Sequence, residues 1–147
     1  MRSFILTFVV GYVVASLLNW GLAELLLNDW AAPQMGGFMR AGDDAASGAS
    51  IIKLTFGFMV PLLVIATFQE LIVKPASWTA RAILIAVLVS AAAFYGTYTF
   101  IAGYGNVNWF PLMGFAAADT ACMVIGALVI GFLRQWESSQ RFPELPR

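Results

Sequence analysis

Apolar residues dominate four long segments of the chain, and polar residues gather in the stretches between them. The four segments are residues 4–27, 51–73, 78–101 and 109–133. Each is long enough to cross the hydrocarbon core of a bilayer, which takes about 20 mostly apolar residues in a helix. The pattern therefore predicts an all-α integral membrane bundle of four transmembrane helices, organised as a single membrane domain over residues 1–147.

The polar stretches between the predicted spans are short, with one exception. Residues 28–50 form the longest stretch, and their first part, which includes Trp30, is suited to lie along the membrane surface because tryptophan prefers the headgroup level. Pro75 ends the second span, and Ser77 is a candidate N-cap for the third. Residues 134–147 are expected to form a polar tail after the fourth span.

Lysine and arginine are distributed unevenly between the two sides of this arrangement. One side holds both termini and has Arg2, Lys74, Arg81, Arg134, Arg141 and Arg147, whereas the other side has Arg40 and Lys53. Because positively charged flanks stay in the cytoplasm, both termini and the tail are expected to be cytoplasmic, with residues 28–50 outside. The compact chain and its short loops favour a bacterial inner membrane.

The composition also indicates a membrane protein. Hydrophobic residues make up 61% of the chain and charged residues 11%, whereas a soluble domain has about 45–50% apolar and roughly 25% charged residues. The formal net charge is zero, so there is no reason to expect nucleic-acid binding. The expected partners are the lipid bilayer and either a second copy of the chain or another membrane protein.

The residue types that carry most redox and metal chemistry are missing. The chain has no histidine, which excludes histidine-ligated haem, copper and zinc as well as an imidazole proton shuttle. Its one cysteine, Cys122, excludes an internal disulfide and a Cys-x-x-Cys pair. The pattern shows no acid and base that fall together, so we expect no catalytic residue, no metal site, no cofactor and no enzymatic activity.

Asp119 is the strongest candidate for a functional side chain, because it lies well inside the fourth apolar segment. A charge at the centre of a membrane helix costs about 2.5–3.5 kcal/mol on insertion scales, and such residues often mark ion or proton pathways. The alternative is a structural role, in which Asp119 is protonated, hydrogen-bonded or paired with another subunit. Its candidate polar neighbours within the membrane are Asn19, Tyr95, Thr97, Tyr98 and Thr99.

The remaining charges near the predicted spans fall at helix ends. Glu24 is expected to meet Lys53 at the outer boundary, as a structural pair. Glu70 has Lys74 one turn away and Arg81 across a short loop, which favours charge pairing at the opposite boundary.

Small residues recur at intervals of four in three predicted spans, and this spacing places them on one side of each helix. Such stripes let helix backbones approach closely in a membrane. They comprise Gly11 and Ala15 in the first span, Ala86 and Ser90 in the third, and Gly114, Ala118, Cys122 and Gly126 in the fourth. We interpret them as packing surfaces, within the bundle or toward a partner. Pro61, near the middle of the second span, is expected to kink that helix.

Three functional hypotheses follow. The first is a non-enzymatic membrane protein that acts through helix–helix contacts, as a homo-oligomer or as an accessory subunit of a membrane complex. The second is a small proton- or ion-coupled carrier or channel that uses Asp119. The third is a lipid- or quinone-binding protein, which rests only on the 12 phenylalanines and 4 tyrosines. The sequence favours the first, because it lacks recognisable chemistry and is rich in small-residue stripes.

Overall fold

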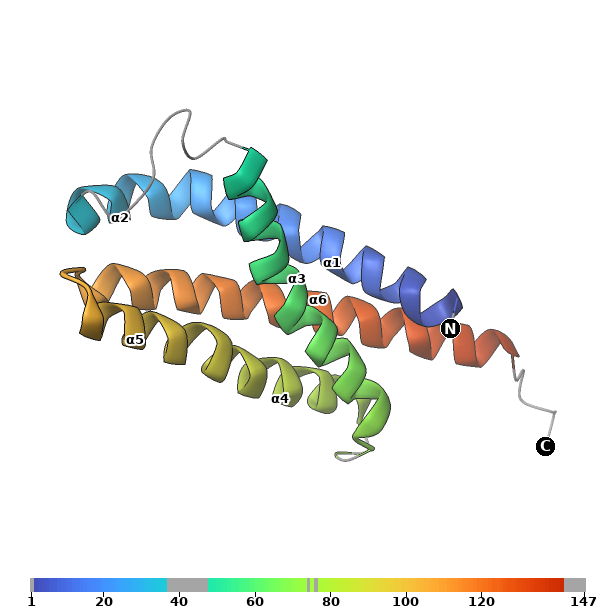
Figure 1. Cartoon of the computed structure of the whole chain (residues 1–147). Helices are drawn as coiled ribbons and strands as arrows, with labels where there is room; N and C mark the ends of the chain where they lie inside the picture. Colours follow the sequence, from blue (N-terminus) through green and yellow to red (C-terminus); the bar gives the residue numbers. More distant parts are fainter. Residues whose placement is uncertain (1, 37–47, 74, 76, 142–147) are drawn as a thin grey trace.

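The computed structural model describes residues 2–36, 48–73, 75 and 77–141, and within this part it contains helices and no strand. The elements in chain order are α1 (Arg2–Leu22), the π-helical η1 (Ala23–Leu27), α2 (Asn28–Met35), α3 (Gly48–Leu71), α4 (Trp78–Ser90), the π-helical η4 (Ala91–Gly96), α5 (Thr97–Tyr104) and α6 (Trp109–Arg141) (Figure 1). Ser77 is the N-cap of α4, as predicted, and its side chain accepts a hydrogen bond from the backbone N–H of Ala80.

Four helical runs are long and apolar enough to cross a membrane, which confirms the predicted number of spans. They are Ser3–Leu25, Ile51–Leu71, Trp78–Tyr104 and Trp109–Gln140. The π-helical segments do not interrupt the first and third runs. The structure therefore indicates an all-helical membrane protein with four candidate spans.

Two boundaries differ from the prediction. Residues 28–35 are not part of a loop, because α2 continues the first helical run through η1. Ala31 and Met35 are buried in a small cluster with Leu112 of α6, and this burial offsets the weak helix propensity of a segment that contains Pro33. The predicted tail also begins within a helix, since α6 continues to Arg141. Residues 37–47 of the predicted outer loop and residues 142–147 lie outside the described residues, and residues 48–50 of that loop form the start of α3.

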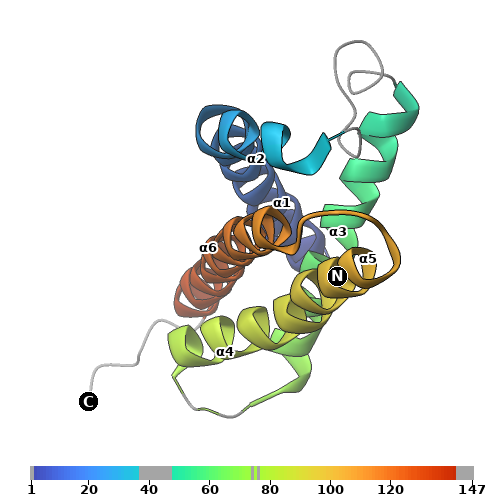
Figure 2. The same cartoon turned by 90° about the vertical axis from the view of Figure 1, so that its left-hand side faces the viewer.

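Helix α6 is the centre of the bundle. It packs along α1 on one side and along α4 and α5 on the other, and α3 crosses obliquely (Figures 1 and 2). In its most apolar window 44% of the residues are buried, against 17–22% in the other three spans. The main core accordingly includes Met123, Ala127 and Ile130 of α6.

Glycine lets α1 and α6 approach each other closely. A Cβ atom on Gly126 would lie 3.0 Å from Cβ of Ala15 and 3.2 Å from the carbonyl oxygen of Gly11. A Cβ atom on Gly11 would lie 2.5 Å from Cγ1 of Ile130. Larger residues at either glycine would force the two backbones apart, so these positions set the separation of the helices.

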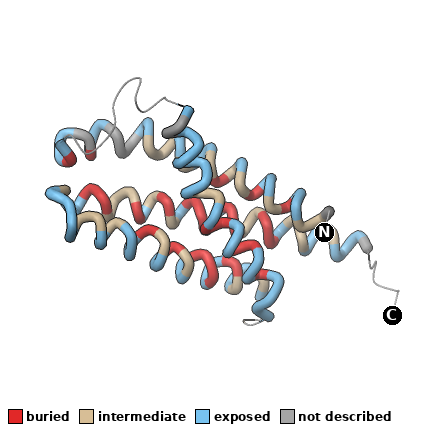
Figure 3. The backbone as a smooth tube through the Cα atoms, in the orientation of Figure 1, coloured by how far each residue is buried: buried red, intermediate tan, exposed pale blue. Residues whose placement is uncertain are grey.

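The two halves of α3 differ sharply in burial (Figure 3). The second half contributes Leu62, Ile65 and Ala66 to the main core. By contrast, residues 51–57 are all exposed, with Leu54 at 71% exposure. Pro61 is buried at the point where α3 changes from exposed to packed, and α3 continues as one helix through it.

Candidate functional site

Asp119 lies at the centre of a hydrogen-bonded network that joins three helical segments. The side-chain amide of Asn19 on α1 donates to Oδ1 of Asp119 at 2.5 Å. The hydroxyl of Tyr98 on α5 donates to Oδ2 at 2.8 Å. Asp119 is 8% exposed and is therefore almost withdrawn from the surface. Both carboxyl oxygens thus have a neutral donor, and each donor comes from a different neighbouring helix.

The position of each partner follows from the local structure. Asn19 lies on the side of α1 that faces α6, about one turn from Ala15 of the close contact with Gly126. Tyr98 follows the π-helical segment η4 by two residues. A π-helical segment contains more residues per turn than an α-helix and so rotates the side chains that follow it. The sequence indicated Tyr98 as one of several hydroxyls, but the choice among them depends on this rotation.

The other hydroxyl-bearing candidates lie away from the carboxyl group. Tyr95, Thr97 and Thr99 are exposed on the outside of the bundle. The hydroxyl of Thr99 accepts a hydrogen bond from Nε1 of Trp109 at 3.3 Å, which ties α5 to the start of α6. The structure therefore brings together Asp119, Asn19 and Tyr98 and does not bring the other three to them.

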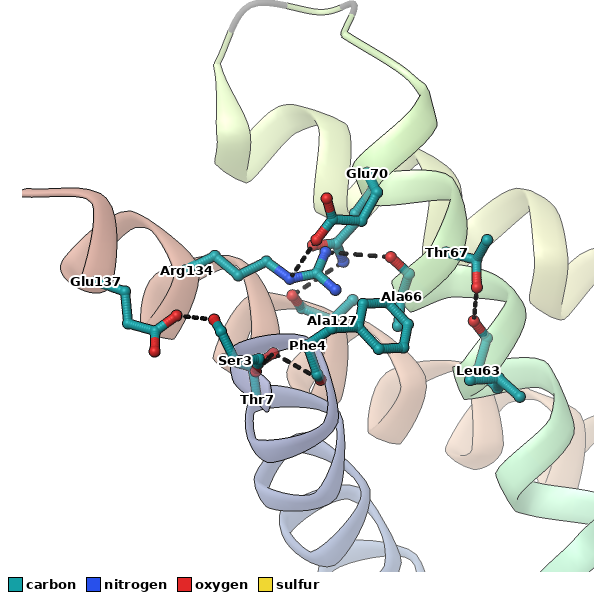
Figure 4. Close-up of polar contacts among 11 residues, drawn as sticks. Ser3, Phe4, Thr7, Leu63, Ala66, Thr67, Glu70, Ala127, Arg134 and Glu137 are labelled. Carbon is teal, nitrogen blue, oxygen red and sulfur yellow. Dashed lines mark hydrogen bonds and ion pairs between the residues drawn. The ribbon is translucent and has the colours of Figure 1, made fainter. Parts of the chain in front are cut away.

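A second polar cluster lies at the end of the bundle where α1 begins and α6 ends, and it is built around Arg134 of α6 (Figure 4). Nη1 of Arg134 donates to the carbonyl oxygen of Ala66 on α3 at 3.1 Å, and Nε lies 3.3 Å from a carboxylate oxygen of Glu70. The guanidinium also covers the ring of Phe4 on α1, with Cζ 5.2 Å from the ring centre. Arg134 therefore contacts both α1 and α3 from α6.

The observed ion pair differs from the predicted trio of Glu70, Lys74 and Arg81. Within the described residues, Glu70 pairs with Arg134 instead of Arg81, whose Nη1 donates to the carbonyl oxygens of Val73 and Pro75 at 3.3 and 3.5 Å. Lys74 lies outside the described residues. The physical reason is the packing of α3 on α6, which places Glu70 beside a long side chain that is distant in sequence.

Further polar contacts in this cluster join α1 and α3 to α6. Nε2 of Gln69 donates to the carbonyl oxygen of Ala127 at 3.1 Å, and the hydroxyl of Ser3 donates to the carboxylate of Glu137. Sequence reasoning assigned no role to Ser3, Gln69 or Glu137, and it treated Arg134 only as a flanking charge. The available signal was a glutamine and an arginine near the ends of apolar segments, which is weak because such residues commonly face the interface.

The predicted outer pair is not formed in the described part of the chain. Glu24 in η1 and Lys53 in α3 are both exposed, and no salt bridge joins them. Residues 51–57 of α3 are exposed at every position, and Tyr12 of α1 contacts the carbonyl oxygen of Thr55 at 3.5 Å.

The predicted packing residues occupy three different contacts. Gly11, Ala15, Cys122 and Gly126 are buried, and Ala118 is half-buried. Ala86 and Ser90 are fully buried on α4, with the Ser90 hydroxyl lacking a hydrogen-bond partner. A Cβ atom on Gly114 would lie 2.8 Å from the ring of Trp30, so this glycine accommodates α2 and its aromatic side chain.

Asp119 lines neither of two surface cavities. An apolar groove of about 570 Å³ lies between α3 and the run formed by α4 and η4. A polar cavity of about 360 Å³ lies at the Arg134 cluster and is lined by Arg81, Glu70, Glu137 and neighbouring polar residues.

The described residues contain no group of three or more histidine, cysteine, aspartate or glutamate side chains suited to hold a metal ion. Comparisons of the chain with protein-family models, with curated proteins and with solved structures found no match. The features of the described residues that bear on function are the two polar clusters, the two cavities and the exposed half of α3.

Proposed function

We propose that this chain is a non-enzymatic membrane protein that acts through helix–helix contacts, as a homo-oligomer or as an accessory subunit of a membrane complex. The observation that carries the proposal is the exposed N-terminal half of α3. Residues 51–57 form about two helical turns and are exposed at every position. The segment is apolar apart from Lys53 and Thr55, and an apolar helix surface is typically buried by lipid or by other protein.

The composition of this half-helix favours protein over lipid as its neighbour. A Cβ atom on Gly57 would meet nothing within 4 Å, which leaves room for an approaching backbone. Small residues of this kind are typical of helix contacts in membranes. Within the described residues, the hydrogen bond from this segment to the rest of the bundle is a long one, from the Tyr12 hydroxyl to the carbonyl oxygen of Thr55 at 3.5 Å.

The proposal includes an orientation and a location. Arg81 and Arg134 lie at the end of the bundle where α1 begins and α6 ends, and Lys53 lies toward the opposite end. This distribution favours cytoplasmic termini by the positive-inside rule. A bacterial inner membrane remains the expected location on the grounds of compactness and short connections.

Native mass spectrometry of the protein extracted gently from its own membrane tests the proposal. The expected result is a defined mass that contains either several copies of the chain or one copy with a second protein. The informative variant is Gly57→Phe, which fills the open position on α3. Gly103→Phe is the matched control, because Gly103 of α5 is also exposed with nothing within 4 Å.

We expect Gly57→Phe to shift the assembly toward the single chain and Gly103→Phe to leave it unchanged. A wild-type protein that is strictly monomeric, with no co-purifying protein in mild detergent, would contradict the proposal. Equal effects of the two variants would show that the exposed half of α3 is not the contact surface.

A second candidate function is a small proton-linked carrier that uses Asp119. It is favoured by one observation, that an acid buried at mid-span is linked to both neighbouring helices through Asn19 and Tyr98. Proton-linked flux into liposomes tests it, with Asp119→Asn as the variant. Flux that survives this substitution unchanged would remove Asp119 from the role.

A further inference from the structure

The apolar groove between α3 and α4 opens on the outer surface of the bundle. Its floor includes Ile85, which is 3% exposed, and the buried Pro61. Its rims are half-exposed apolar side chains such as Phe68 and Leu88. A groove of this kind within candidate membrane spans presents an apolar surface to whatever surrounds the helices.

Two helix irregularities line the same groove from opposite sides. Pro61 lies on the α3 side, and Ala92 and Ala93 of the π-helical η4 lie on the other. A proline removes one backbone hydrogen bond, and π-helical segments occur frequently at functional sites. The small side chains of Ala92 and Ala93 also leave the space between the two helices unfilled.

The groove extends over one half of the candidate span. Its α3 wall runs from Val60 to Ile72, which corresponds to about 18 Å along a helix axis. The hydrocarbon core of a bilayer is about 30 Å thick, so one leaflet contributes about half of this length. Ile72 follows the end of the span and Val60 lies near its middle. The groove therefore matches the depth of a single leaflet, on the side that holds both termini.

The polar cavity lies beside the end of the groove that is marked by Ile72, near the end of the candidate span. Gln69 and Glu70, which line the polar cavity, lie between Phe68 and Ile72, which line the groove, along α3. On α4, Arg81 of the polar cavity precedes Ile85 of the groove by one turn. An amphiphile with its chain in the groove would thus place its polar group near this cavity.

The charges around the polar cavity have both signs. Arg134 and Glu70 form an ion pair with each other. Within the described residues, the guanidinium of Arg81 contacts only backbone carbonyl groups, and the carboxylate of Glu137 accepts a hydrogen bond from the Ser3 hydroxyl. Arg81 and Glu137 are therefore one cationic and one anionic side chain outside the ion pair. Together they complement a headgroup with a phosphate and an ammonium group.

We propose that the groove between α3 and α4 binds one acyl chain of a phospholipid with a zwitterionic, amine-bearing headgroup. Arg81 binds the phosphate and Glu137 binds the ammonium group. Two arginines and two glutamates line the cavity, so it has no net positive charge to attract a net-negative headgroup. A zwitterionic headgroup is therefore preferred to a net-negative one. This site is separate from the exposed half of α3, and the inference does not depend on a protein partner there.

Lipid retention in native mass spectra tests the proposal. The full chain is reconstituted in nanodiscs that contain equal amounts of phosphatidylethanolamine and phosphatidylglycerol with identical acyl chains. The wild type is expected to retain phosphatidylethanolamine preferentially. Ala92→Phe places a ring in the groove, and Ala91→Phe is the matched control, because Ala91 is an exposed neighbour in η4 that does not line the groove.

We expect Ala92→Phe to lower lipid retention by about fivefold through lost van der Waals contacts, with Ala91→Phe close to the wild type. Arg81→Gln should lower retention of both lipids by about tenfold, because it removes a charge-assisted bond to phosphate. Lys53→Gln, which removes a charge at the opposite end, is its control. Glu137→Gln should abolish the preference for phosphatidylethanolamine while retaining phosphate binding.

Equal retention by Ala92→Phe and Ala91→Phe would overturn the assignment of the groove. Wild-type retention of phosphatidylglycerol at or above the level of phosphatidylethanolamine would overturn the assignment of the headgroup. Circular dichroism of each variant shows whether the helices are intact, so that a loss of lipid is attributed to the site and not to unfolding.

Discussion

The two polar clusters mark opposite parts of one antiparallel contact between α1 and α6, and they are built differently. At the end with both termini, Ser3 bonds to Glu137 and Phe4 lies under Arg134. At mid-span, Asn19 bonds to Asp119. Between the two clusters, Gly11 and Gly126 bring the backbones into contact. One contact therefore contains a charged part, a tightly packed part and a part with neutral donors.

The difference between the clusters shows how depth along the span restricts polar partners. The Glu70 side chain is 52% exposed, so its pair with Arg134 remains accessible to solvent or headgroups. Asp119 is 8% exposed, and its two observed donors are an amide and a phenol. Long cationic side chains reach the interface from a helix end, whereas mid-span positions favour neutral donors that stay within the bundle.

The largest effect is expected from Gly126→Leu, which breaks the contact between the two clusters. The new side chain would clash with Ala15 and with the backbone of Gly11, and because the backbones must move apart we expect a cost of about 3 kcal/mol or more, at the upper end for overpacking. We expect a lower free energy of unfolding and faster maleimide labelling of Cys122, which is fully buried in the wild type. Gly103→Leu is the control, and equal labelling rates for both variants would contradict the role of the close contact.

A smaller effect is expected from Asn19→Leu, which breaks only the mid-span cluster. It leaves Asp119 buried with one donor fewer, and an unsatisfied buried group costs about 1–3 kcal/mol. In a Tyr98→Phe background, the double variant Asn19→Leu with Asp119→Leu should recover part of this loss, because no polar partner of the cluster is then left buried. A double-mutant cycle measured by unfolding in mixed micelles checks the coupling, and strictly additive effects would argue against the observed hydrogen bond.

Arg134→Met is expected to break the terminal cluster at a cost of about 1–2 kcal/mol. It removes the contact with the Phe4 ring and the hydrogen bond to Ala66, while the half-exposed ion pair with Glu70 adds little. Unfolding measured at low and high salt distinguishes these contributions. A loss that largely disappears at high salt would indicate that the ion pair dominates instead.

The smallest effect is expected from Glu24→Gln, which alters a charge outside both clusters. Glu24 is exposed and forms no salt bridge within the described part of the chain, so the free energy of unfolding should change by no more than about 0.5 kcal/mol. The same unfolding assay checks this value. A loss comparable to that of Arg134→Met would indicate that Glu24 has a partner and that polar stabilisation is not confined to the two clusters.

Several features of the fold could be predicted from local sequence alone. The four apolar segments and their lengths determine the number of candidate spans, and Ser77 determines the start of α4. The polar stretch of residues 28–50 predicts a loop that begins at residue 28, whereas residues 28–35 are helical in the structure. Their helical structure depends on burial against Leu112, which lies about 80 residues away in sequence and carries no local signal.

The candidate site could be predicted only in part. The isolated position of Asp119 in an apolar segment made it conspicuous, and Asn19 and Tyr98 were among five possible polar neighbours. The choice of these two, like the pairing of Arg134 with Glu70, depends on how the helices rotate and cross. Side chains three or four residues apart lie on the same face of a helix, so their proximity can be predicted from sequence. No comparable spacing predicts which residues of two different helices are in contact.

The pattern of residues along the chain was thus enough to predict that it is helical, that four segments are apolar and long enough to span a membrane, and that one acid interrupts the last of them. The packing of the helices was needed to show that α6 is central, that the N-terminal half of α3 is exposed, and that a leaflet-deep groove lies beside a polar cavity. Hydrophobicity and helix periodicity are properties of each segment, whereas clusters, grooves and unpaired surfaces arise from the packing of segments that are distant in the chain.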